Sequence, residues 1–110
     1  MSDQQTPRYG HAPVPMTRRG CEGDVDAVGD FAWKFGADRD RRFLIVALPR
    51  PRPEAPKDYV LNCLPVQAGP NTPGKWWGWD GNEESPTLTP SVHCIGHWHG
   101  WVRGGTLVEA

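Results

Sequence analysis

The chain has 110 residues and a formal net charge of -1 at pH 7, with 13 glycines, 12 prolines and six tryptophans. This length predicts one small core, in which large indole rings take the place of aliphatic side chains. The balanced charge excludes electrostatically driven nucleic-acid binding, and the longest apolar run, residues 43–48, is too short to cross a bilayer.

The first twenty residues are rich in glutamine, proline and glycine and show no hydrophobic period. This composition predicts a flexible N-terminal arm over residues 1–20, followed by a single small β-rich domain over residues 21–110. No apolar stretch typical of a secretory signal precedes Cys21. We therefore expect a protein that is not secreted by a signal peptide and that resides in the cytoplasm or in a virion.

Apolar alternation and continuous apolar runs predict strands that are separated by turn signals. In chain order the predicted extended segments are residues 31–35, 43–48, 59–66, 76–79, 87–94 and a hairpin of 97–102 with 106–108. No helical period is sustained. The fold class predicted is mainly β, a small antiparallel sheet or open barrel with long Pro/Gly-rich loops.

Five arginines cluster in one stretch on either side of the apolar run 43–48, at Arg39, Arg41, Arg42, Arg50 and Arg52. Acidic residues interrupt the first part of this run. The pattern favours a solvated face over a phosphate-binding patch.

The densest group of chemically active side chains lies in residues 93–99, with the sequence His-Cys-Ile-Gly-His-Trp-His. On an extended strand His97 and His99 would share a face, and Cys94 precedes His97 with a Cys-x-x-His spacing. With Cys63 from a neighbouring strand these residues make a Cys₂His₂ set, for which zinc is the first choice. The competing interpretation is a buried cysteine beside packed histidines.

Other residues offer weaker alternatives. Cys21 is the alternative to Cys63 as the fourth ligand, and His93 faces away from Cys94. A Ser-His-Asp set of Ser91, His99 and Asp80 is disfavoured because no nucleophile elbow surrounds the serine. No catalytic residue and no organic cofactor site is therefore predicted.

Five of the tryptophans lie in the C-terminal half, where they line a ligand groove or fill the core, and core packing is the favoured interpretation. They are Trp76, Trp77, Trp79, Trp98 and Trp101.

Three motifs of the C-terminal half resemble the pattern W-x-W-D-G-N, P-T-L-S/T-P-S, C and W-H-G of an uncharacterised family of small phage, prophage and bacterial proteins. They are Trp77-Gly78-Trp79-Asp80-Gly81-Asn82, Pro86-Thr87-Leu88-Thr89-Pro90-Ser91, and Cys94 with Trp98-His99-Gly100-Trp101. The resemblance covers roughly residues 59–108. It implies that Cys94 and His99 are metal ligands and that Cys63 matches a less fixed cysteine. The chain departs from the family at Gly96, near where members carry a further cysteine.

These features together favour a non-enzymatic phage-type accessory or structural protein, stabilised by a zinc site and acting by binding another protein, in a virion or on a host protein. A small zinc-dependent hydrolase and an inhibitor of a host defence system are the alternatives. Neither nucleic acid nor a membrane is an expected partner, and the oligomeric state is left open.

Overall fold

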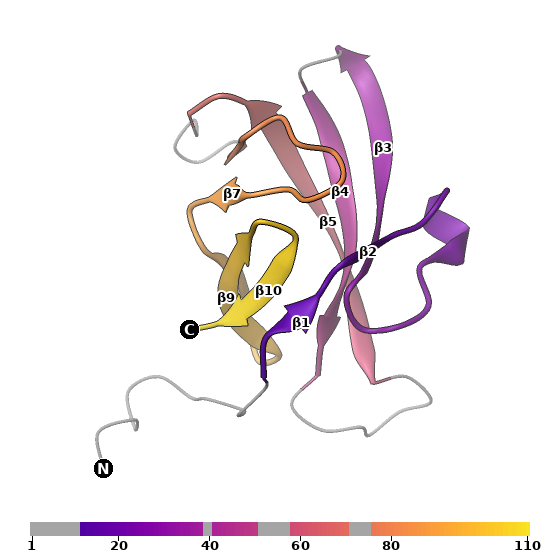
Figure 1. Cartoon of the computed structure of the whole chain (residues 1–110), viewed down its shortest axis with the longest axis vertical. Helices are drawn as coiled ribbons and strands as arrows, with labels where there is room; N and C mark the ends of the chain where they lie inside the picture. The colour runs from indigo at the N-terminus through magenta and orange to yellow at the C-terminus, as the bar shows by residue number, and fades with distance from the viewer. Residues whose placement is uncertain (1–11, 39–40, 51–57, 71–75) are drawn as a thin grey trace.

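The computed structural model of the chain describes residues 12–38, 41–50, 58–70 and 76–110. Figure 1 shows that nearly all of this chain is strand and loop, and the helical structure in the described ranges is one 3-10 turn, Glu22–Asp24. None of the helices described is long and apolar enough to span a membrane. The predicted mainly β fold class is confirmed.

The larger sheet has long antiparallel strands at its centre and short strands at its ends. In sheet order they are β2 (Thr17–Arg18), β3 (Asp30–Asp38), β4 (Arg41–Pro49), β5 (Tyr59–Ala68), β6 (Trp77–Trp79) and β7 (Leu88–Thr89). The apolar run of residues 43–48 falls in β4, which pairs with β3 on one side and β5 on the other. A central strand with both faces covered tolerates such a continuous run, and residues 44–49 are all buried.

The smaller sheet is entirely antiparallel. In sheet order its strands are β1 (Val14–Pro15), β10 (Thr106–Glu109), β9 (Trp98–Arg103) and β8 (Val92–Cys94). Gly104 and Gly105 join β9 to β10 with φ values of +54° and +75°, a pair of left-handed residues that suits a two-residue hairpin turn. The predicted C-terminal hairpin is confirmed.

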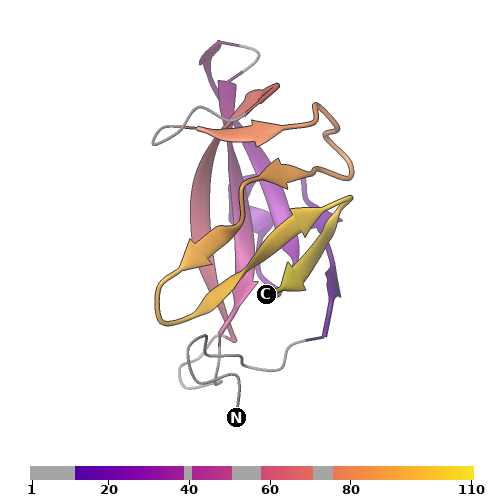
Figure 2. The same cartoon turned by 90° about the vertical axis from the view of Figure 1, so that its left-hand side faces the viewer.

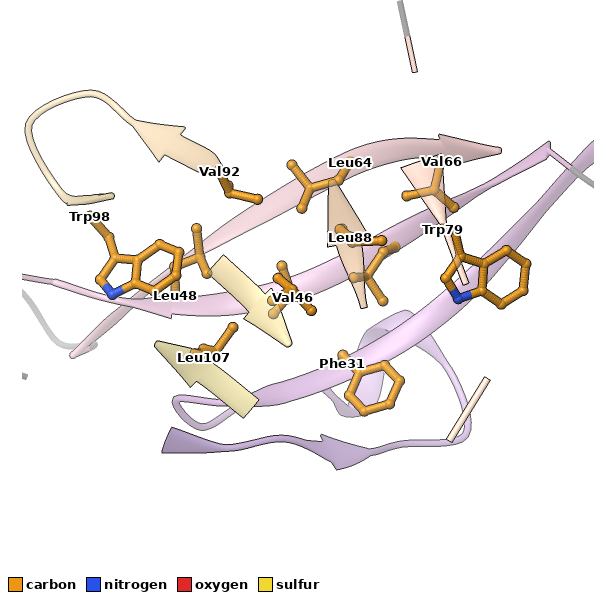
Figure 3. Close-up of a cluster of buried hydrophobic side chains, with 12 residues drawn as sticks. Phe31, Val46, Leu48, Leu64, Val66, Trp79, Leu88, Val92, Trp98 and Leu107 are labelled. Carbon is orange, nitrogen blue, oxygen red and sulfur yellow. The ribbon is translucent and has the colours of Figure 1, made fainter. Parts of the chain in front are cut away.

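The smaller sheet lies across one face of the larger sheet, and its strands cross those behind them (Figure 2). The core fills the space between the sheets and draws side chains from both (Figure 3). The buried residues of this cluster are Phe31, Leu44, Val46, Leu48, Leu64, Val66, Trp79, Leu88, Val92, Trp98, Val102 and Leu107. Core packing is thus the role of Trp79 and Trp98, while Trp77 and Trp101 are half-buried.

The segment predicted as a flexible arm contributes a strand to each sheet. The backbone N–H of Met16 donates to Gly105 O at 2.9 Å, and that of Thr17 donates to Gly29 O at 3.0 Å. The boundary at residue 20 is therefore wrong for the described part of the arm, because backbone pairing holds a segment that has no apolar period. Residues 1–11 lie outside the described ranges.

Arg42 also departs from its predicted setting, since its exposed fraction is only 8%. Its Nη1 donates to Glu83 Oε2 at 2.8 Å, and its guanidinium lies 5.6 Å from the ring centroid of Trp33 and 4.8 Å from that of Trp79. A planar and weakly hydrated cation stacks well on indole faces. The interpretation of the arginine run as a solvated face is wrong at this position.

Candidate functional site

The predicted metal ligands lie on different surfaces of the fold. Strand alternation turns Cys63 to the exposed outer face of β5, whereas its neighbours Asn62 and Leu64 face inward. Cys94 lies on the inner side of β8, where its Sγ accepts a hydrogen bond from Asn62 Nδ2 at 3.5 Å. His99 lies on the opposite, outer face of the smaller sheet.

His97 is not part of a strand at all. It closes a turn between β8 and β9, in which its N–H donates to Cys94 O at 2.9 Å and Gly96 has a φ of +81°. Its Nδ1 is buried and has no hydrogen-bond partner within the described part of the chain. The alternation that would place His97 and His99 on one face therefore does not apply.

Within the described ranges no group of three or more His, Cys, Asp or Glu side chains could hold a metal ion. The prediction of a metal-binding, zinc-binding protein is corrected accordingly: Cys63, Cys94, His97 and His99 do not converge. Cys21, the alternative ligand, lies at the 3-10 turn, where its Sγ donates to Asp24 Oδ2 at 3.4 Å.

The β8–β9 hairpin does bring a serine and a histidine together. Ser91 Oγ lies 3.1 Å from His99 Nε2, a hydrogen-bonding distance. The cause is the register, which pairs Val92 with Gly100 and His93 with His99. Because alternate residues share a face, Ser91 and His99 both point to the outer face, where each is half-buried.

Aromatic rings flank the imidazole of His99 along this face. The His93 ring lies on the paired strand at a centroid distance of 4.8 Å, and the Trp101 ring lies two residues along β9 at 6.3 Å. The guanidinium of Arg103 lies 4.5 Å from the Trp101 centroid and continues the row. Both rings therefore lie beside the His99 imidazole on the outer face of the smaller sheet.

Gly100 contributes to the outward orientation of the His99 side chain. A Cβ at Gly100 would lie 2.2 Å from Val108 O and 2.6 Å from the Trp98 ring. The Trp98 indole therefore lies across the bare backbone of Gly100 inside the core, and strand alternation then directs His99 to the solvent side. Both neighbours of His99 are thus fixed by core packing.

Asp80, the third member of the disfavoured Ser-His-Asp set, serves its own loop. Its Oδ1 accepts hydrogen bonds from the N–H groups of Asn82 at 3.1 Å and Thr87 at 3.2 Å. The Trp79 indole N–H donates to Asn82 O at 3.1 Å, so the Trp-Asp-Gly-Asn motif is a structural loop. Within the described ranges no carboxylate hydrogen-bonds to His99, and the site is a serine–histidine pair.

The geometry defines a small two-sheet β protein with a solvent-facing Ser–His pair on one hairpin. A protein-family model described as "Bacterial ubiquitination-like system serine protease (BubE)" matches residues 58–110. The matched segment runs from β5 to β10 and contains both Ser91 and His99. No curated protein and no solved structure matches the chain.

This match overturns the prediction of a non-enzymatic phage-type accessory or structural protein of a virion, because the family it names is a protease family of a bacterial system. The resemblance to the family of phage, prophage and bacterial proteins stays a prediction. The sequence had offered Ser91 and His99 only as members of a disfavoured Ser-His-Asp set with Asp80, and the signal that could have favoured the pair is its placement on either side of a short hairpin turn.

Proposed function

We propose that this chain is a serine protease in which Ser91 is the nucleophile and His99 is the general base. The observation that carries the proposal is the contact of 3.1 Å between Ser91 Oγ and His99 Nε2. A nucleophile and its base must lie within hydrogen-bond reach for proton transfer. The family match supports the proposal, because it covers the segment that holds both residues and its description names a serine protease.

The chemistry follows from the pair. Neutral His99 accepts the Ser91 hydroxyl proton at Nε2 while Oγ attacks the peptide carbonyl carbon. The protonated imidazole then gives that proton to the leaving amine, which leaves an acyl ester on Ser91. His99 next takes a proton from water as the water oxygen attacks the ester carbon. The C–O bond to Ser91 then breaks, the acid product leaves, and His99 returns its proton to Ser91 Oγ.

We propose that aromatic rings take the place of the carboxylate that orients the histidine in a serine protease triad. In a Ser-His-Asp triad the carboxylate holds the imidazole in its orientation. Here the rings of His93 and Trp101 flank His99, and β9 fixes its backbone between two residues packed in the core. Packing thus supplies the orientation that a carboxylate supplies elsewhere.

The expected partner was another protein, and a protease takes a polypeptide as its substrate. The family description places its members in a ubiquitination-like system. We accordingly propose a protein of such a system as the source of the substrate.

Covalent labelling with a fluorophosphonate probe tests the assignment. The intact protein is expected to acquire one label, which peptide mass spectrometry places on Ser91. Ser91→Ala should abolish labelling, and His99→Ala should slow it by about 100-fold or more, the usual contribution of a general base. Ser85→Ala is the matched control, because Ser85 is an exposed loop serine. A label on another residue, or undiminished labelling of Ser91→Ala, would refute the proposal.

A further inference from the structure

We infer that the substrate polypeptide binds as an added antiparallel strand along the free edge of β8, paired with the backbone of His93. This inference rests on the proposed function, because it states how the substrate of the Ser91–His99 pair is held. Strand addition to an open sheet edge is a general mode of peptide recognition, in which main-chain hydrogen bonds supply the affinity.

The hydrogen bonds of the smaller sheet determine which backbone groups face that edge. Ala110 N donates to His99 O at 2.8 Å, so the polar backbone groups of His99 point toward β10. In an antiparallel pair, residues that exchange hydrogen bonds alternate with residues that do not. His93, which lies opposite His99, is therefore a non-hydrogen-bonded position, and its N–H and C=O point away from β9.

Ser91 gives an independent check on this direction. By the same alternation its carbonyl should also point away from β9, and it does, because Trp77 Nε1 on the neighbouring sheet donates to Ser91 O at 3.3 Å. The Trp77 indole occupies the edge at Ser91. The pairing proposed for the substrate is therefore centred on His93.

The edge is open to an incoming strand. Within the described part of the chain β8 ends the smaller sheet, and no other strand pairs with its far side. Its sequence, Val-His-Cys, has none of the lysine or proline residues that protect edge strands. Ile95 follows directly and is 83% exposed, which offers an apolar contact to a chain lying along the edge.

The antiparallel direction follows from the shortness of β8. A single residue can exchange both hydrogen bonds with a single partner residue only in an antiparallel pair. In that direction, the substrate residue beside Ser91 lies two positions after the one that pairs with His93. If Ser91 Oγ attacks the carbonyl of the substrate residue beside Ser91, the substrate residue that pairs with His93 lies two positions before the attacked one.

N-methylated peptides provide the test. A mixture of unstructured decapeptides is digested with the protein, and mass spectrometry identifies a cleaved sequence. Two versions of that peptide are then made, each with a single backbone N-methyl group. In the first peptide the group is two residues before the residue whose carbonyl is attacked, and in the second peptide it is one residue before that residue. Loss of one hydrogen bond predicts a fall in kcat/KM of about tenfold for the first peptide. The second is the control, because the N–H that it blocks points away from β8.

A variant pair tests the protein side. His93→Pro removes the edge N–H, and proline is tolerated where a strand's N–H faces solvent. His93→Ala keeps that N–H and loses the ring, so the further loss of peptide cleavage in His93→Pro measures the backbone contribution. Fluorophosphonate labelling should be equal in these two variants, because the probe does not need a paired strand.

The outcomes separate the two proposals. If Ser91 is labelled and peptides are cleaved, but both N-methylated peptides are cleaved at the same rate and His93→Pro equals His93→Ala, strand pairing at β8 is wrong and the serine protease stands. Absence of both labelling and cleavage overturns the proposed function and, with it, this inference.

Discussion

Arg42 and Glu83 form the ion pair that connects the loop between β6 and β7 to the centre of the larger sheet. Arg42 belongs to β4, and Glu83 also lies 3.4 Å from Arg18 Nη2 in β2. The Trp33 indole N–H donates to the Glu83 carbonyl oxygen at 3.0 Å. One acidic residue therefore holds its loop against three strands through its side chain and its backbone.

Acid should release this arrangement. The hydrogen bond from Arg42 lowers the pKa of the Glu83 carboxyl below its ordinary value of 4.5. A carboxyl whose pKa is lower in the folded state stabilises the protein above the unfolded pKa, and the contribution is lost as the pH falls through the folded pKa. Glu83→Gln should thus lower the urea midpoint at neutral pH and have a smaller effect at an acid pH below the folded pKa, where the carboxyl is uncharged like the amide.

Urea titrations monitored by tryptophan fluorescence at the two pH values measure this difference. Glu84→Gln is the matched control, because Glu84 is 72% exposed and its ion pair is with the partly exposed Arg18, and exposed pairs contribute little. An effect of Glu83→Gln that is equal at both pH values would show that the charge of Glu83 is not what stabilises the fold.

At the scale of elements, the strands with local signals could be predicted, whereas the two N-terminal strands could not. The apolar run of β4 and the glycine turn between β9 and β10 carry local signals for their structure. The strands β1 and β2 have two residues each, too few to show a period. They form because distant strands offer backbone partners, which single-sequence patterns do not reveal.

The candidate site shows the same division. The metal hypothesis assumed that His97 and His99 continue one strand, but Gly96 and the turn it forms place His97 outside β9. The Ser91–His99 contact depends on the register across that turn, which is a three-dimensional property. The sequence shows which residue types are present, but it does not show to which face of the sheet each side chain points.

The pairing of β2 should therefore be measurable through its backbone. Thr17→Pro removes the N–H that donates to Gly29 O at 3.0 Å. The loss should lower the free energy of unfolding by about 1–3 kcal/mol, because a carbonyl loses its partner. Thr17→Ala keeps the N–H and is the control. Thermal unfolding by circular dichroism compares them, and equal stabilities would mean that the N-terminal strands contribute nothing to the fold.

At the scale of the whole molecule, the segment matched by the protease family supplies only part of one hydrophobic core. Residues 58–110 supply β5 to β10, whereas Phe31, Leu44, Val46 and Leu48 of the same core cluster come from β3 and β4. Without those strands β5 would lose its antiparallel partner, and the backbone groups along that edge would be left unpaired.

We therefore expect that a fragment of residues 58–110 does not fold alone. Its amide NMR spectrum should have the narrow dispersion of an unfolded chain, whereas residues 12–110 should give a dispersed spectrum and one unfolding transition. Longer fragments that begin at residue 30 and restore β3 and β4 form the control series. A dispersed spectrum for residues 58–110 would show that the C-terminal half is a domain in its own right.

The placement of Ser91 and His99 on the edge hairpin has a consequence for heat inactivation. The proposed nucleophile and base are brought together by three residue pairs between β8 and β9, at the border of a sheet, where local opening requires less free energy than global unfolding. Separation of β8 from β9 would part the two side chains while the strands of the larger sheet stay paired. The proposed catalytic activity should consequently decrease on warming well below the melting temperature and return fully on cooling. Its temperature optimum would then report the local opening of the β8–β9 hairpin rather than the global stability of the protein.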